Sequence, residues 1–174
     1  SEGPLGDGCN GGCIDIALAY LRDTGAAIES CFPYTACDPQ GHGQCSQHPG
    51  GVQCEEKCGN WQEDAWQIGS FSFFSEIEGK KNAIIALGPL VAHMEVYEDF
   101  LAYEGGIYQH MAGDYVGGHA VAVVGYDTYD GIDYWICKNS WGPDWGENGF
   151  FRIKIAGSSM DFPFSHRSIN SPIP

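Results

Sequence analysis

The chain has 174 residues, of which 43% are hydrophobic and 13% aromatic, enough to bury a core as one domain or as two small lobes. Acidic side chains number 23 and basic ones 8, and the resulting net charge of −15 would repel phosphate backbones and anionic lipids. We therefore expect no nucleic-acid partner. We also expect no membrane span, because no apolar run approaches the roughly 20 residues that a bilayer requires.

Cysteines are concentrated near the N-terminus. All but one of the eight lie from Cys9 to Cys58, in a stretch rich in Gly, Pro, Gln and Asp. This density favours disulfides formed in an oxidising compartment. A zinc site is the competing interpretation, because Cys54 and Cys58 have a tolerable ligand spacing, but no second closely spaced pair follows. We favour the disulfides and expect neither a metal nor an organic cofactor.

The N-terminal third predicts one helix. After a glycine-rich stretch, apolar side chains recur at helical spacing at Ile14, Ala17, Leu18 and Leu21. Gly25 offers a stop, so we expect a helix over residues 13–24. Residues 31–59 show no sustained period, and crosslinks rather than packing are expected to hold them.

The pattern becomes β-rich near Trp61. Residues 80–87 predict a short helix closed by Gly88-Pro89, and residues 90–96 alternate between apolar and polar as a half-buried strand does. Three further strand-like runs cover residues 119–126, 133–139 and 149–155, with Asp130-Gly131 as a hairpin turn. The chain is therefore predicted to be α+β, with a helical, crosslinked part over residues 1–60 and an antiparallel sheet or barrel over residues 61–174.

The segment from Gly117 to Phe151 holds the side chains that point to chemistry. An imidazole such as that of His119, at the start of a strand, can accept a proton from a thiol and stay paired with the thiolate if a third group orients it. Asn139 has an amide oxygen for that role, and Trp141 can shield the hydrogen bond from water. Taken singly, such residues are usually structural. Their combination favours an active site.

This combination resembles the papain family of cysteine peptidases, in which a Gly-His-Ala strand and an Asn-Ser-Trp-Gly motif carry two catalytic residues. The matching motifs here are Gly118-His119-Ala120 and Asn139-Ser140-Trp141-Gly142, and Gly8-Cys9-Asn10-Gly11-Gly12 resembles a third family motif. Cys31-Phe32-Pro33-Tyr34 favours the cathepsin B and cathepsin C branches. The resemblance implies a two-lobe papain-like fold, with His119 as general base, Asn139 as the orienting group and Trp141 as the shield.

The nucleophile that this family requires is expected to lie outside the chain. In the family, the catalytic cysteine precedes the histidine by about 130 to 150 residues, and counting back from His119 runs off the chain. Cys9 and Cys13 lie too close to His119 and belong to the turn motif. The oxyanion-stabilising glutamine belongs to the same absent segment. We therefore expect the chain alone to be inactive, with the cysteine on an upstream segment or on a second chain.

The resemblance to cathepsin B also implies two disulfides, Cys31–Cys58 and Cys37–Cys45. Cys9 and Cys54 would then have partners in the absent segment. Spacing alone leaves open that these two cysteines are reduced or pair with each other.

Substrate-binding positions follow from the same resemblance, which points to Gly11, Gly12, Cys13, His93, Ala120 and Ser168. Cys13 stands where the family has a bulkier residue, and His93 stands where it has a small one. We therefore expect a narrowed main specificity pocket, S2, with a titratable wall. The alternative for His93 is a hydrogen-bonded strand residue.

We predict a cysteine-type peptidase that hydrolyses peptide or protein substrates through a thioester, in a lysosome or vacuole or after secretion. The rival prediction is a non-catalytic papain-like domain that serves as a structural or binding module. The upstream sequence discriminates between them, because a Cys-Trp motif there favours the peptidase and Ser or Gly at that position favours the rival.

Overall fold

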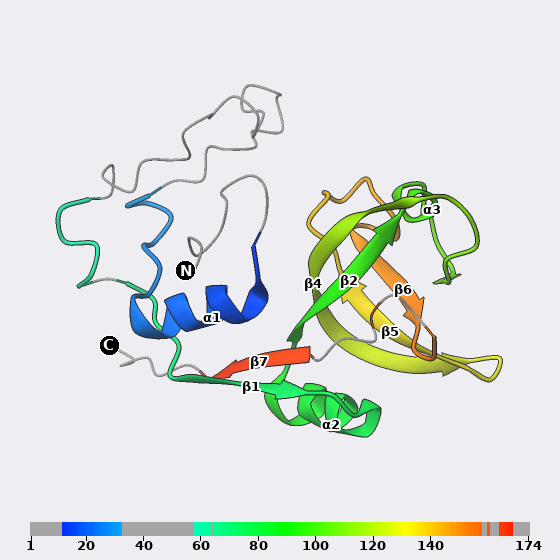
Figure 1. Cartoon of the computed structure of the whole chain (residues 1–174), viewed down its shortest axis with the longest axis horizontal. Coiled ribbons are helices and arrows are strands. Elements are labelled where there is room, and N and C mark those ends of the chain that lie inside the picture. The colour runs from blue at the N-terminus through cyan, green and yellow to red at the C-terminus, as the bar shows by residue number, and fades with distance from the viewer. Residues whose placement is uncertain (1–11, 33–57, 64, 158–159, 161–163, 169–174) are drawn as a thin grey trace. The chain divides into compact units, whose positions relative to one another are not determined.

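The computed structural model describes residues 12–32, 58–63, 65–157, 160 and 164–168. The chain divides into two compact units (Figure 1). Unit 1 comprises residues 1–71 and 167–174, and unit 2 comprises residues 72–166. No helix in the described part of the chain is long and apolar enough to cross a membrane.

Unit 1 contains the helix α1 (Ile14–Asp23), which confirms the predicted helix to within one residue at each end. Leu18 is the residue of α1 that is buried. The helix stops at Gly25, whose φ of +85° favours glycine, and a Cβ there would lie 3.1 Å from the carbonyl oxygen of Trp66. Glycine is therefore needed both for the turn and for the close approach of the chain at Trp66.

One of the two predicted disulfides lies among the described residues and is confirmed. Cys31 and Cys58 are bonded, with 5.2 Å between their Cα atoms. Cys58 is therefore not available as a zinc thiolate. The other predicted crosslink, Cys37–Cys45, lies outside the described residues, as do Cys9 and Cys54.

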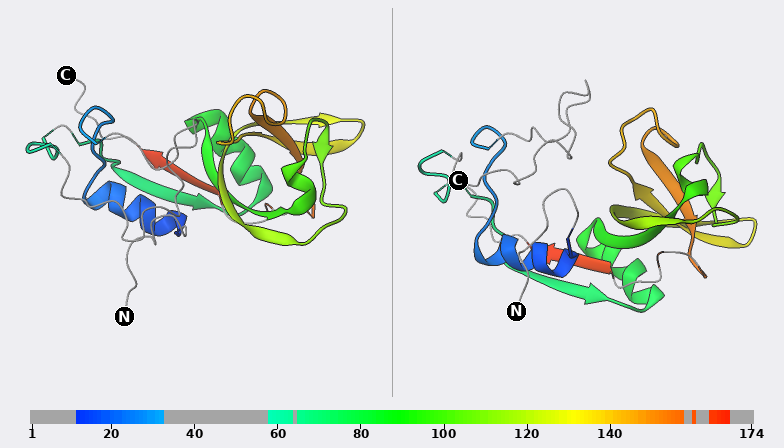
Figure 2. Two further views of the ribbon diagram at one scale, coloured as in Figure 1. Left: turned by 90° about the horizontal axis from the view of Figure 1, so that it is seen from above. Right: turned by 45° about the horizontal axis from the view of Figure 1, so that its top comes forward.

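The sheet has seven strands in the order β1-β7-β2-β4-β5-β6-β3. The strands are β1 (Ser70–Phe74), β2 (Leu90–Tyr97), β3 (Ile107–Tyr108), β4 (Tyr115–Tyr129), β5 (Ile132–Lys138), β6 (Phe150–Lys154) and β7 (Phe164–Ser168). Two further helices are α2 (Ile77–Leu87) and α3 (Glu98–Leu101). Figure 2 shows that β4 is strongly curved.

The strands predicted over residues 90–96, 119–126, 133–139 and 149–155 are found as β2, β4, β5 and β6, and these strands pair antiparallel with their neighbours in that order. The predicted hairpin turn is also found, with positive φ at Asp130 and Gly131. The predicted antiparallel arrangement therefore holds for these strands, and the short edge strand β3 differs from them because it pairs parallel with β6. With two residues, β3 is too short to show a sequence period.

The alternation in β2 separates two faces. Leu90, Ala92, Met94 and Val96 are buried in the main hydrophobic cluster, which also contains Trp135, Phe151 and Phe100. The residues between them, including His93, Glu95 and Tyr97, lie on the opposite and partly exposed face. The register with β4 pairs Met94 with His119 and His93 with Ala120. Because directly paired residues share a face, His119 lies on the core side, and His93 and Ala120 lie on the other side.

The carboxylate of Asp99 in α3 holds the loop that follows β3. It accepts hydrogen bonds from the Tyr108 hydroxyl (2.6 Å), from Nδ1 of His110 (3.1 Å) and from the backbone N–H groups of Met111 (2.8 Å) and Ala112 (3.2 Å). Partial burial alone would raise the pKa of Asp99. The hydrogen bonds outweigh this effect of burial, and the largest contribution comes from the backbone N–H of Met111. The pKa of Asp99 therefore lies well below its ordinary value.

We expect Asp99→Asn to lower the free energy of unfolding at neutral pH and to flatten its dependence on acid pH. The pKa of Asp99 is lower in the folded chain than in the unfolded one, where it is about 3.9. Its contribution is therefore fully present above that value and is lost as the pH falls below it. Urea unfolding at neutral and acid pH should show the parent protein approaching the variant as the pH decreases. A difference that stays constant would contradict this role.

Candidate active site

His119 and Asn139 lie in direct contact, as their pattern predicts. The distance between Nε2 of His119 and Oδ1 of Asn139 is 2.8 Å. His119 is on β4, and Asn139 directly follows β5, the hairpin partner of β4. The backbone N–H of Asn139 donates to the carbonyl of Gly149 (2.9 Å), and Asn139 is only 7% exposed. The asparagine is therefore held from both its backbone and its side chain.

The side-chain amide of Asn139 determines which nitrogen of His119 carries the hydrogen. Its Oδ1 also accepts the backbone N–H of Ser140 at 2.8 Å, so the oxygen, and not the NH₂ group, faces both neighbours. An amide oxygen only accepts, and Nε2 of His119 must therefore donate. In the neutral imidazole this leaves the lone pair on Nδ1. Nδ2 of Asn139 is buried and has no hydrogen-bond partner in the described part of the chain.

Trp141, the predicted shield, stacks on the imidazole of His119. Their ring centroids are 5.0 Å apart and the ring planes differ by 27°. Trp141 in turn meets Trp145 and Phe100 edge to face, with centroids at 5.0 and 5.6 Å. The indole N–H of Trp145 donates to the backbone carbonyl of Leu101 (3.1 Å). An aromatic cluster thus supports the imidazole from the side of the core.

The loop between β5 and β6 carries Trp141 and Trp145 and is braced at its far end. Glu147 pairs with Arg152 on β6 and accepts the backbone N–H of Gly106 (3.2 Å). The hydrogen bond from Arg152 is the main reason that the pKa of Glu147 is lowered. Gly149 has a φ of +84°, and a Cβ there would lie 3.1 Å from the carbonyl oxygen of Gly142. The sequence motif identified the loop, but not this brace or the part played by Phe100.

His93 lies against the glycine that precedes the candidate histidine. A Cβ added at Gly118 would lie 2.7 Å from Nε2 of His93, although Gly118 does not have a positive φ. The close contact, and not the backbone conformation, therefore favours glycine here, since any larger residue would displace the tip of the His93 side chain. A Cβ at the neighbouring Gly117 would meet nothing within 4 Å.

We expect Gly118→Ala to lower the free energy of unfolding by about 1–3 kcal/mol, because the added methyl displaces the imidazole of His93. Gly117→Ala is the matched control, since its Cβ enters open space. Adding His93→Ala to Gly118→Ala should recover most of the loss. Urea unfolding of the parent, the two single variants and the double variant completes the double-mutant cycle. Equal effects of the two alanine substitutions would show that His93 does not restrict position 118.

The other predicted substrate-binding residues are spread over the chain. Gly12 and Cys13 are exposed and directly precede α1 in unit 1, and Cys13 is not in a disulfide. Ala120 is the cross-strand partner of His93 in unit 2. Ser168 is the last residue of β7, and its side chain lies outside the described part of the structure, as does Gly11. His93 and Ala120 are therefore the pair that the sheet register brings together.

Known proteins are similar to this chain in sequence and in fold. The model of the papain family of cysteine proteases matches residues 2–162. The chain belongs to this family. The cathepsin B-like protein CP2 of Giardia intestinalis is 39% identical over 149 residues, which cover 83% of this chain and 47% of the relative. Cathepsin B of Dictyostelium discoideum is 36% identical over 155 residues, 85% of this chain and 50% of the relative.

Solved structures of the family agree with these matches. Procathepsin B S9 from Trypanosoma congolense matches with a TM-score of 0.82 at 27% identity, over 96% of this chain and 56% of the other. The α+β papain-like fold and the likeness to cathepsin B are thereby confirmed. This papain-family chain spans about half the length of the curated relatives that it matches.

Proposed function

We propose that the chain provides the general base and the orienting amide of a papain-type cysteine peptidase. The observation that carries this proposal is the orientation of the Asn139 amide, which keeps the hydrogen of His119 on Nε2 and the lone pair on Nδ1. A neutral imidazole held in this tautomer is ready to take a proton from a thiol. Trp141 stacks on the imidazole and limits the access of water to the hydrogen bond.

The proposed reaction is hydrolysis of a peptide bond through a thioester. A cysteine thiol gives its proton to Nδ1 of His119, and the thiolate attacks the carbonyl carbon. The imidazolium then donates this proton to the amide nitrogen as the C–N bond breaks, so the amine leaves and the thioester remains. A water molecule next loses a proton to Nδ1 and attacks the thioester carbonyl, and the C–S bond breaks to release the acid. The imidazolium then returns its proton to the thiolate. Throughout these steps, Oδ1 of Asn139 accepts the hydrogen bond that Nε2–H of His119 donates.

We place the nucleophile on an upstream segment or a second chain. The family spacing supports this placement. Cys137 is unsuited to the role, because it is 0% exposed and burial raises the pKa of its thiol far above the ordinary value. A buried, protonated thiol acts as a small apolar side chain, and Sγ of Cys137 packs 3.9 Å from Sδ of Met160.

An epoxide inhibitor of cysteine peptidases tests this placement. In the protein that carries this chain with its natural upstream sequence, the label should attach to one upstream cysteine, as peptide mass spectrometry would show. His119→Ala should slow the labelling. Labelling of Cys13 would contradict the upstream placement of the nucleophile. No labelling of a folded and full-length protein would favour a non-catalytic papain-like domain.

We further propose that His93 and Ala120 line the S2 pocket, together with Gly11, Gly12, Cys13 and Ser168. The cross-strand pairing of His93 with Ala120 supports a shared wall. The imidazole of His93 would then help to set the preference for the second residue before the scissile bond. An unchanged preference in His93→Ala at every pH would contradict this assignment.

We also propose that residues 1–60 are a remnant of the helical lobe and that residues 61–174 form the β-barrel lobe. The Cys31–Cys58 disulfide supports an oxidising compartment, such as a lysosome, a vacuole or the extracellular space. The proposed partners are a peptide or protein substrate and the segment or chain with the nucleophile. The proposed chemistry needs no cofactor, because imidazole and thiol supply both the proton transfer and the nucleophile.

A further inference from the structure

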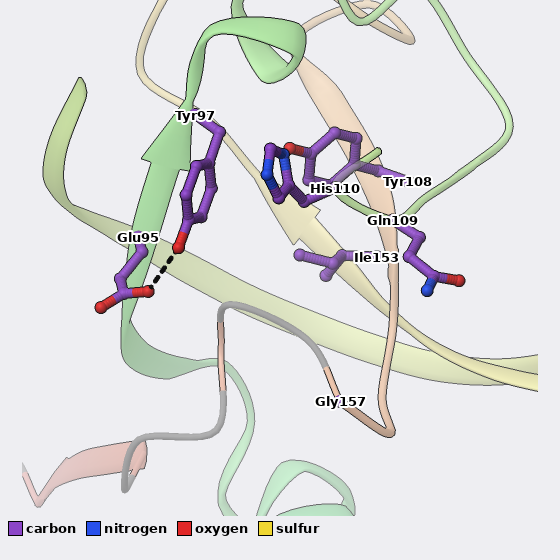
Figure 3. A pocket seen from close by; sticks show the side chains of 7 residues that line it. All are labelled: Glu95, Tyr97, Tyr108, Gln109, His110, Ile153 and Gly157. Atoms are coloured by element: carbon purple, nitrogen blue, oxygen red, sulfur yellow. Dashed lines mark hydrogen bonds between the residues drawn. The ribbon is translucent and has the colours of Figure 1, made fainter. Parts of the chain in front are cut away.

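A pocket of about 230 Å³ opens in unit 2 and contains neither His119 nor Asn139 (Figure 3). Glu95 and Tyr97 line it from β2, and Ile153 lines it from β6. Tyr108, Gln109 and His110 line it from the end of β3 and the loop that follows. The pocket therefore joins strands that are far apart in the sheet order.

The sheet topology explains why a pocket forms here. β2 pairs with β4 along its whole length, whereas its pairing with β7 among the described residues is at Val91. β3 is the last strand of the sheet and pairs with β6. The part of β2 that contains Glu95 and Tyr97 thus faces β3 and β6 without a described strand between them, and the pocket lies there (Figure 3).

The charges around the pocket favour a cation. Among the described residues that line it, Glu95 is the one carboxylate, and none is a lysine or an arginine. The hydroxyl of Tyr97 donates to Glu95 at 3.0 Å and holds the carboxylate in place. His110 contacts the carboxylate of Asp99 through Nδ1 at 3.1 Å, so its imidazole is already paired with a negative group. Among the described lining residues, no cationic side chain balances Glu95, so its carboxylate would attract a positively charged ligand.

The other residues that line the pocket suit the aliphatic part of a ligand whose positive charge lies at Glu95. The rings of Tyr97 and His110 stack with centroids 3.9 Å apart and planes 19° apart, which makes a continuous flat wall. Lysine-like groups bury their methylene stem on such surfaces while the ammonium group stays near a carboxylate or an aromatic face. Ile153 also lines the pocket, but it belongs to the hydrophobic core and is only 1% exposed, so it presents little free surface.

We propose that this pocket binds an alkylammonium group, either of a free diamine or of a lysine side chain on a protein partner. Glu95 pairs with the ammonium group, and the methylene chain lies along the stacked rings of Tyr97 and His110. The proposal does not depend on peptidase activity, because none of these residues belongs to the His119–Asn139 pair.

The test is NMR of the full-length protein with a labelled isoleucine δ1-methyl group, read at Ile153. Titration with 1,5-diaminopentane should give a saturable shift, and the uncharged 1,5-pentanediol should give much less. Glu95→Gln should weaken binding of the diamine about three- to fivefold, the range expected for a partly exposed ion pair. Glu104→Gln is the matched control, since it removes the same charge from an exposed residue that does not line the pocket.

Two further ligands separate the sources of the ammonium group. A short peptide with one lysine that binds where the diamine does not would assign the pocket to a protein partner, and its norleucine analogue should then fail to bind. Equal responses to the diamine and the diol would overturn the proposal. So would affinity that is unchanged in Glu95→Gln, or no saturable shift of Ile153 with any amine.

Discussion

His119→Ala should lower kcat/KM by at least about 10³-fold in the full-length protein, because it removes the group that both deprotonates the thiol and protonates the leaving amine. Nδ1 is the one ring nitrogen that Asn139 leaves free for this work. A fluorogenic peptide amide measures the loss. Retention of more than a tenth of the activity would show that His119 is not the base.

The reactivity of the nucleophile gives a second measure of the same variant. An imidazolium partner keeps a cysteine ionised at acid pH, so the parent protein should react with iodoacetamide well below the ordinary thiol pKa of about 8.5. In His119→Ala the reaction should require a pH near that value. Circular dichroism serves as the control, because a misfolded variant would no longer show the spectrum of the parent protein.

Two substitutions of Asn139 separate orientation from charge. Asn139→Ala removes the acceptor of the Nε2 hydrogen, so we expect activity to fall by less than in His119→Ala, with imidazole free to adopt the wrong tautomer. Asn139→Asp retains an acceptor oxygen and should keep more activity than Asn139→Ala. Equal losses in the two variants would mean that the amide oxygen does not orient His119.

Phe100→Ala should lower the free energy of unfolding by about 3–5 kcal/mol, the usual cost of deleting a buried aromatic ring. Phe100 is 0% exposed, and its centroid lies 4.9 Å from Phe151, 5.0 Å from Trp145 and 5.6 Å from Trp141. The cavity would therefore loosen both the core and the aromatic cluster beneath His119. Urea unfolding of the full-length protein measures the loss.

Two controls accompany Phe100→Ala. Phe100→Leu retains most of the volume and should cost clearly less. Leu101→Ala changes the neighbouring residue, which is 49% exposed, and should change the free energy of unfolding by no more than about 0.5 kcal/mol. The carbonyl of Leu101 that binds Trp145 remains in that variant. If Phe100→Ala and Leu101→Ala lowered the free energy of unfolding by similar amounts, the buried ring of Phe100 would not be important for stability.

The regular elements with a clear period were predictable from the sequence. Apolar and polar residues alternate over the eight residues of β2, and the apolar residues of α1 recur at helical spacing over almost three turns. The elements that were missed are short or lack a period, such as α3 with four residues and β3 with two. Asp99 anchors this region through contacts 9 to 13 residues along the chain, and no local pattern shows such contacts.

The chain's own residues identified the His119, Asn139 and Trp141 motif, because it is a set of side-chain types at fixed spacing. Only the tertiary structure decided that Nδ1 carries the lone pair, since that depends on the orientation of the Asn139 amide toward Ser140. It also decided that His93 and Ala120 share the face opposite His119. Period within a strand determines which residues share a face, but the pairing of separate strands determines which of them meet.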